Sequence, residues 1–195
     1  AHEYKRGYPD LQKPGQGKWL QNDYVKFIRF AELKLLANEV GILGFITDHS
    51  YLDNPTFKGM RHHLRQSFPY MRIVDLHGNS KKKEKAADGS KDESVFSITQ
   101  GTAIGLYALG AETADEKSLD ILGTKKLKLD AMLRTSLRSE PLTTLFPNEP
   151  LWLFKPQAQA GRSDYENGWG LPVIFSPNGD PAPGIVTTHD EFAIS

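Results

Sequence analysis

The chain has 195 residues, and its 24 Lys and Arg balance its 24 Asp and Glu, so the formal net charge at neutral pH is zero. A chain of this length fits one domain, and zero net charge does not by itself call for a polyanionic partner. The absence of cysteine excludes disulfides, thiolate zinc sites and thiol nucleophiles. No apolar run approaches the ~20 residues that span a bilayer, so we expect a cytoplasmic protein with no membrane partner.

The first 18 residues hold three glycines and two prolines without an apolar period, which predicts an irregular, exposed arm. A domain rarely starts this way, so we expect the chain to be a fragment of a longer protein. Residues 19–38 give the clearest helix, with Asn22 or Asp23 as its cap. Its apolar stripe, which should face a sheet, consists of Tyr24, Phe27, Ile28, Ala31 and Leu35.

The run from Ile42 to Ile46, opened by Gly41, is continuously apolar and predicts a strand covered on both faces, as in a parallel sheet. Ligands bind beyond the carboxyl ends of strands in open α/β sheets. A polar cluster follows this strand at once and therefore marks the rim of a candidate site. Its members are Thr47, Asp48, His49, Ser50 and Tyr51.

A basic helix is predicted over 58–66, with an apolar face of Phe57, Met60 and Leu64. A strand follows over 70–76, and the alternation of helix and strand predicts a parallel α/β sheet. Residues 102–109 form another strand. Since no helix separates these last two strands, we expect them to be antiparallel, joined by a long loop.

Residues 81–93 of that loop are too charged to pack, which favours a solvated segment. The alternative is a loop near phosphates, where lysines neutralise charge. The lysines concerned are Lys81, Lys82, Lys83 and Lys85, and Phe96 follows as an apolar residue surrounded by polar ones. From residue 112 onward an acidic patch leads into irregular structure with one helix, an extended segment at 151–154 and a linker-like tail over 165–195.

The histidines do not form a recognised metal motif. His62 and His63 are adjacent, so on a helix they point about 100° apart, and neither they nor His49 belong to an HExxH pattern. We therefore expect surface histidines and no metal site. Asp48, His49 and Ser50 are neighbours on a loop and cannot align as a catalytic triad.

Four stretches together resemble the adenine-specific DNA methyltransferases: NDYVKFIRFAELKLL, GILGFITDHSYLD, FKGMRHHL and RIVDLHGNSKKKEKAADGSKDESVFSITQGTAIGLY. The strongest similarity is to the methyltransferases of large restriction–modification polypeptides, which join a nuclease, a methyltransferase and a target-recognition part. The tail resembles the segment that leads to the recognition domain, so the resemblance runs from Trp19 to the end.

The resemblance implies an α/β fold: the C-terminal half of a Rossmann-like, S-adenosylmethionine-dependent methyltransferase sheet over 19–111, with 112–195 as an extension towards target recognition. Asn22, Asp23, Tyr24 and Phe27 would line the pocket for the cofactor's adenine, and residues 47–51 the active-site rim. Phe96 would stack on the flipped target base, and the four loop lysines would lie near phosphates of double-stranded DNA.

Simpler interpretations stand beside these roles, since Phe96, Tyr24 and Phe27 are also residues that pack in cores. The family's Gly-containing cofactor loop and its Asn/Asp-Pro-Pro-Tyr/Phe tetrapeptide are absent from the sequence. We therefore expect the chain alone to be inactive, and its partners to include the upstream catalytic half and the downstream recognition domain. The parent would methylate the exocyclic amine of adenine. The alternative is a non-catalytic DNA-binding or structural fragment with a degenerate methyltransferase fold.

Overall fold

The computed structural model describes residues 2–86, 88–134, 136, 141–158, 160–161 and 167–168. The chain divides into two compact units, residues 1–157 and 158–195, and the architecture below is that of the first. Most of the predicted linker over 165–195 lies outside the described residues. No helix among the described residues is long and apolar enough to cross a membrane.

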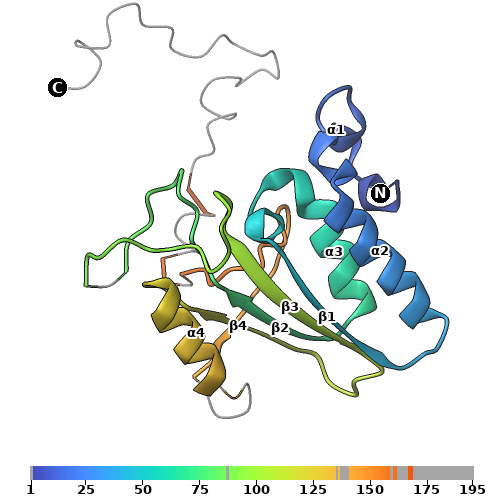
Figure 1. Ribbon diagram of the computed structural model, residues 1–195. Helices are drawn as coiled ribbons and strands as arrows, with labels where there is room; N and C mark the ends of the chain where they lie inside the picture. Colours follow the sequence, from blue (N-terminus) through green and yellow to red (C-terminus); the bar gives the residue numbers. More distant parts are fainter. Residues whose placement is uncertain are drawn as a thin grey trace, which may run out of the picture. The chain divides into compact units, whose positions relative to one another are not determined.

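The first unit contains four α-helices and five strands within the described residues (Figure 1). The helices are α1 (Pro9–Gln12), α2 (Asp23–Leu36), α3 (Lys58–Ser67) and α4 (Lys125–Arg134). The strands are β1 (Gly41–Asp48), β2 (Tyr70–Asp75), β3 (Thr102–Leu109), β4 (Asp115–Asp120) and β5 (Thr143–Thr144). Short 3-10 turns cover Glu3–Lys5, Lys18–Gln21, His49–Leu52 and Pro55–Phe57.

The strands form one mixed sheet in the order β1-β3-β2-β4-β5. Strand β3 is antiparallel to both β1 and β2, so β1 and β2 run in the same direction, and β4 pairs parallel with β2. The antiparallel pairing predicted for residues 70–76 and 102–109, which form β2 and β3, is confirmed. Strand β4 was not predicted, because its sequence DEKSLD is mostly polar and lies near the edge of the sheet, where outward side chains meet water.

Helices α2 and α3 pack on one face of the sheet and α4 on the other (Figure 1). The predicted apolar face of α3 is confirmed, since Phe57, Met60 and Leu64 are at most 1% exposed. On the opposite face a smaller core joins Val74 and Ile121 to residues of the long loop and α4. The sheet is therefore covered on both faces around β2.

The N-terminal segment belongs to the larger core, on the face covered by α2 and α3, whereas the sequence predicted an exposed arm. Tyr4 and Leu11, both within the predicted arm of residues 1–18, are buried. The segment approaches α3 closely at Gly59, where an added Cβ atom would lie 2.0 Å from the Tyr4 carbonyl oxygen. Isolated apolar residues fill this interface, and isolated residues produce no periodic signal in the sequence.

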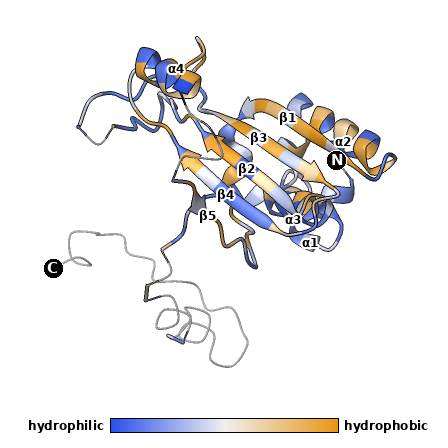
Figure 2. Cartoon of the chain, turned by 90° about the horizontal axis from the view of Figure 1, so that it is seen from below, coloured by the Kyte–Doolittle hydropathy of each residue, from blue (hydrophilic) through white to orange (hydrophobic). Residues whose placement is uncertain are grey.

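Strand β1 differs from its prediction, because it lies at the edge of the sheet and only one of its faces is covered. Leu43 is buried, but Ile42 is 76% exposed and Ile46 is 53% exposed. Figure 2 shows this apolar strand at the border of the sheet beside α2. On α2 the predicted stripe is buried at Ile28, whereas Phe27 is 59% exposed and faces away from the core.

Arg61 fixes the segment around residue 152 to the rest of the unit. Arg61 is not part of the apolar face predicted for α3, yet its side chain is fully buried. Its guanidinium donates hydrogen bonds to the carbonyls of Tyr51, Asn54, Leu151 and Trp152. The described residues from 112 to 157 thus belong to the same compact unit as the sheet.

Candidate functional site

Strands β1, β2 and β4 run in the same direction, so their carboxyl ends lie on the same side of the sheet. We call this side the carboxyl edge, as distinct from the border strand β1. The turn at His49–Leu52 follows β1 there, and the loop of residues 76–101 leaves from β2 and returns to β3. This edge is where open α/β sheets bind ligands. The five residues predicted as a rim lie at this edge.

Three of the five rim residues hold the local turn together, and a fourth, Tyr51, joins the turn to β3. The Asp48 carboxylate accepts a hydrogen bond of 2.7 Å from the Ser50 amide, which caps the turn. The Thr47 hydroxyl donates to the Asp48 carbonyl. Tyr51 is buried, and its hydroxyl lies 2.9 Å from that of Tyr107. These contacts shape the rim, whereas the fifth residue, His49, points towards β2.

His49 joins a cluster of ionisable side chains that the sequence did not predict. Its Nδ1 lies 3.0 Å from Asp75 Oδ1, at the end of β2. His77 Nε2 lies 2.7 Å from Asp120 Oδ1, at the end of β4, and 3.8 Å from Asp75 Oδ2. Lys155 Nζ lies 3.2 Å from Asp75 Oδ2. One ligand atom each from His49, Asp75 and His77 lie within 4.8 Å of one another.

Charge pairing dominates the protonation of this cluster. Burial alone would raise the pKa of Asp75, but the hydrogen bond from His49 and the charge of His77 hold that pKa well below its usual range. Burial would lower the pKa of His77, but the hydrogen bond to Asp120 and the charge of Asp75 raise it. Asp75 and Asp53 likewise raise the pKa of Lys155 against the effect of its burial.

The expectation of surface histidines is wrong for His49, which is 2% exposed. Its imidazole occupies space that only glycine leaves free, since a Cβ atom on Gly101 would lie 2.4 Å from the ring. The relevant sequence signal was the position of His49, Asp75 and His77 at the ends of two strands. Motif searches miss it, because the residues come from separate strands.

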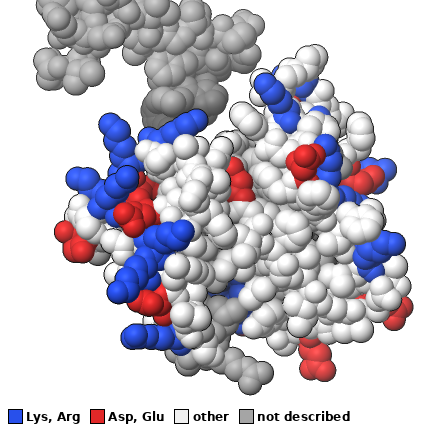
Figure 3. Space-filling view, viewed as in Figure 1, with Lys and Arg blue, Asp and Glu red and all other residues white. Residues whose placement is uncertain are grey.

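The long loop carries the predicted lysines, and all four (Lys81, Lys82, Lys83 and Lys85) are exposed. Lys and Arg side chains gather over this loop and α4 on the left of Figure 3, with acidic groups among them. The loop is anchored at its base by buried Asp92, which accepts hydrogen bonds from the amides of Gly78 and Gly123. Asp92 also forms a 2.7 Å ion pair with buried Lys128 of α4.

Phe96 is 41% exposed, so it is not a buried core residue behind the hairpin. Its neighbour Val95 is buried in the smaller core and fixes the backbone at this point. Phe96 lines a surface hollow together with Gly78, Ser80, Lys91 and Lys125, among others. The hollow is also lined by the carboxylates of Asp92 and Glu93, so its charges balance. An exposed aromatic ring on a fixed backbone suits a planar ligand that stacks on it.

The four candidate cofactor residues lie at the start of α2, and the structure separates them into two groups. Tyr24 packs against Tyr51 and Phe57, with ring centroids 6.5 and 6.2 Å away, and so lies beside the rim. Asn22 is the N-cap residue of the helix. Asp23 forms an exposed ion pair with Lys26, and Phe27 is exposed on the outer side of α2.

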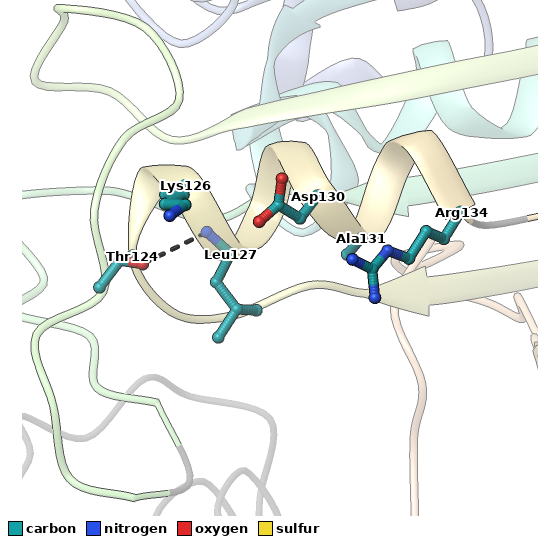
Figure 4. A pocket seen from close by; sticks show the side chains of 6 residues that line it. All are labelled: Thr124, Lys126, Leu127, Asp130, Ala131 and Arg134. Atoms are coloured by element: carbon teal, nitrogen blue, oxygen red, sulfur yellow. Dashed lines mark hydrogen bonds between the residues drawn. The ribbon is translucent and has the colours of Figure 1, made fainter.

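A second hollow lies along the outer side of α4 (Figure 4). The amide of Leu127 donates a 3.3 Å hydrogen bond to the Thr124 hydroxyl, which caps the helix. The lining residues are Thr124, Lys126, Leu127, Asp130, Ala131 and Arg134. All come from α4 or the residue before it, so a ligand there would contact a single helix, and we place the candidate site at the sheet edge instead.

Comparison with known proteins gives the same architecture in larger enzymes. No family model matches the chain, and no curated protein matches it significantly. Among solved structures, a nuclease-deletion mutant of the Type ISP restriction–modification enzyme LlaGI, in complex with a DNA substrate mimic, is 25% identical with a TM-score of 0.58. The chain is similar in fold to Type ISP restriction–modification enzymes.

Two further structures show the same fold. The ATP-dependent Type ISP enzyme LlaBIII, bound to DNA, is 20% identical over 81% of this chain, with a TM-score of 0.60. A complex of DrdV with DNA is 24% identical, with a TM-score of 0.58. The LlaGI and DrdV matches each cover 67% of this chain. The chain spans only 11% of the LlaBIII chain and 13% of the LlaGI and DrdV chains.

Proposed function

We propose that this chain is part of a restriction–modification enzyme and contributes half of its adenine-specific DNA methyltransferase domain. The parent enzyme transfers a methyl group from S-adenosylmethionine to the exocyclic amine of adenine in a specific site of double-stranded DNA. The likeness to LlaGI, LlaBIII and DrdV supports the assignment to a DNA-bound enzyme of this kind. The sequence resemblance supports the methyl-transfer chemistry.

The observation that carries the proposal is the position of Phe96. Its exposed ring belongs to the loop that follows the carboxyl end of β2 and lies in a hollow with Lys91, Lys125, Asp92 and Glu93. Enzymes that modify a base in duplex DNA rotate it out of the helix and hold it against apolar or aromatic side chains. Phe96 supplies such a face, and the exposed lysines of the same loop neutralise the phosphates next to the flipped nucleotide.

The unpaired edge of β1 supports the second part of the proposal, that the sheet continues into the rest of the polypeptide. Among the described residues β1 pairs with β3 alone. Large apolar side chains are exposed on both sides of this edge: Ile42 and Ile46 on the sheet, and Phe27 and Phe30 on α2. A long apolar edge strand promotes aggregation unless another strand pairs with it or another element covers it. A strand with flanking helices from the upstream half covers it.

The cofactor site in this proposal is shared between the two halves. S-adenosylmethionine supplies the methyl group. This chain contributes Tyr24, which its contacts with Tyr51 and Phe57 hold beside the rim, and Phe27, whose exposed ring offers an apolar surface at the junction. The glycine loop and the tetrapeptide come from the upstream half, so the chain alone transfers no methyl group.

The test is methyl transfer from labelled S-adenosylmethionine to DNA by the full-length parent, by its Phe96→Ala variant and by the 195-residue chain. We expect activity in the parent, at least tenfold less in the variant and none in the chain. Phe146→Ala is the matched control, because Phe146 is also an exposed phenylalanine, 51% accessible, but does not line the hollow. An intact parent that binds DNA without methylating it would favour the non-catalytic alternative.

Base flipping gives a second readout for Phe96. A fluorescent adenine analogue in the target site brightens when it leaves the base stack, so its emission reports flipping separately from chemistry. Equal methylation and equal emission in the parent and the Phe96→Ala variant would contradict the stacking role. Replacing the four loop lysines by alanine should weaken DNA binding and make it less salt-dependent, with the slope reduced by up to about 0.9 for each phosphate that the lysines neutralise.

A further inference from the structure

We propose that His49, Asp75 and His77 form a binding site for a divalent transition-metal ion of the zinc type. The three residues lie at the carboxyl edge of the sheet, and one ligand atom of each lies within 4.8 Å of the others. This site is separate from the Phe96 hollow and does not depend on the proposed methyl-transfer function. Metal binding can therefore be tested without DNA or S-adenosylmethionine.

The distances within the cluster suit a metal ion after the side chains move together. Ligand atoms about 2.1 Å from one tetrahedral zinc ion lie about 3.4 Å apart, so a pair at the 4.8 Å limit closes by about 1.4 Å. His49 Nδ1 and Asp75 Oδ1, at 3.0 Å, already have the separation of two ligands at a right angle. The second carboxylate, Asp120, lies 2.7 Å from His77 and is 38% exposed, so it is free to complete the site.

Two buried atoms of the cluster have unused bonding capacity. Asp75 Oδ2 and His77 Nδ1 are inaccessible to solvent and, among the described residues, have ion-pair partners but no well-aligned hydrogen bond. Lys155 Nζ lies 3.2 Å from Asp75 Oδ2, and Glu84 Oε1 lies 3.6 Å from His77 Nδ1. Buried polar atoms of this kind normally have a hydrogen-bond partner, and each exception calls for an explanation. Asp75 Oδ2 is the stronger indication, because its side chain is only 4% exposed and the oxygen lies 3.8 Å from His77 Nε2.

The ammonium of Lys155 competes with a metal ion for Asp75, but it has a second carboxylate partner to which it can stay bound when the ion displaces it. The ammonium lies 3.2 Å from Asp75 Oδ2, where it already balances the carboxylate charge. It also lies 3.4 Å from Asp53 Oδ2, outside the cluster. When the metal ion binds Asp75, Lys155 keeps Asp53 as its partner, so no unpaired ammonium is left behind.

The donor set defines the class of metal. Two imidazole nitrogens and one or two carboxylates favour zinc, cobalt or nickel over magnesium and calcium, which prefer oxygen ligands alone. His77 and Asp120 lie at the surface end of the cluster, with side chains 12% and 38% exposed, and give the ion an entrance. The structural consequence is a link between β1, β2 and β4 at the base of the long loop.

The experiment titrates the metal-free 195-residue chain with Zn²⁺ by calorimetry and with Co²⁺ by visible absorption. We expect one ion per chain and a cobalt spectrum typical of nitrogen and oxygen ligands. His77→Asn should weaken binding at least tenfold, and asparagine tolerates the positive φ of 48° at this position. His49→Gln should have the same effect, whereas His2→Gln, at an exposed histidine, is the control.

Lys155→Met separates a metal site from a purely ionic cluster. Removing the ammonium that competes for Asp75 should lower the dissociation constant for the metal ion several-fold. The proposal is overturned if the unmodified chain shows no saturable binding, or if His77→Asn and His49→Gln bind as the unmodified chain does. It is equally overturned if His2→Gln loses as much affinity as they do, because binding would then be non-specific.

Discussion

Glu32 of α2 gives the sharpest test of how the N-terminal segment is held, because it is a fully buried carboxylate with four donors. Oε2 accepts hydrogen bonds from the Tyr4 hydroxyl at 3.0 Å and from Arg29 at 2.8 Å. Oε1 accepts from Ser67 at 2.6 Å and lies 2.8 Å from His63 Nδ1. One side chain therefore ties α2 to the N-terminal segment and to α3.

Burial by itself would raise the pKa of Glu32, but the hydrogen bonds from His63, Ser67 and Arg29 lower it from 4.5 to about 2. Because the pKa is lower in the folded state, the resulting stabilisation is fully present above the unfolded value of 4.5. It is lost as pH falls towards 2. The difference corresponds to roughly 3 kcal/mol in the free energy of unfolding. Replacing Glu32 by glutamine leaves Arg29 without its carboxylate, which costs a similar amount.

The measurement is urea denaturation of the chain and of Glu32→Gln, followed by circular dichroism at several pH values between 7 and 3. We expect Glu32→Gln to be destabilised by about 3 kcal/mol at pH 7, with the gap narrowing below pH 5. Glu112→Gln removes the same charge from an exposed position and is the control. A gap below 0.5 kcal/mol at pH 7, a threshold set by ordinary surface substitutions, or a gap that does not change with pH would refute this reasoning.

Three further predictions concern buried charges and the open edge. Arg61→Met should expose the segment around residue 152 to limited proteolysis, because its carbonyls lose their shared donor; an unchanged cleavage pattern would contradict this. Lys128→Met should lower the free energy of unfolding by roughly 3 kcal/mol, because Asp92 is left buried and unpaired. In the double variant, Asp92→Asn should recover part of this lost stability. If denaturant titrations show that the stability losses of the two single variants simply add in the double variant, the ion pair between Lys128 and Asp92 does not stabilise the fold. The isolated chain should self-associate through its unpaired border strand β1, and the double variant Ile42→Lys, Ile46→Lys should reduce this association with little change in stability. Sedimentation velocity measures the association. A folded variant that associates as strongly would show that β1 is not responsible.

The sequence predicted those elements whose burial follows a regular pattern. Helix α3 has a clean apolar face, and β2 and β3 are short apolar runs, so their positions and antiparallel pairing were predicted correctly. Strand β1 is equally apolar but lies at the edge, and no pattern within the chain reveals that a face is left open. Arg61 and Glu32 are buried because polar groups from distant segments converge on them.

The candidate site was predicted in part for the same reason. The rule that ligands bind beyond the carboxyl ends of strands led to residues 47–51, and the structure places them after the carboxyl end of β1. The contact of His49 with Asp75 and the approach of Lys155 depend on strand order and on the docking of the segment held by Arg61. Such contacts arise from tertiary structure and cannot be predicted from the spacing of these residues along the chain.

The antiparallel position of β3 between β1 and β2 also bears on how this protein can evolve. The loop of residues 76–101 starts and ends on neighbouring strands, since Asp75 pairs with Ala103. Its two ends are fixed side by side whatever its length, and doubling a flexible loop costs only about 0.6 kcal/mol in closure entropy. Insertions or deletions between residues 80 and 91 can therefore change the reach and chemistry of the loop while the sheet stays intact.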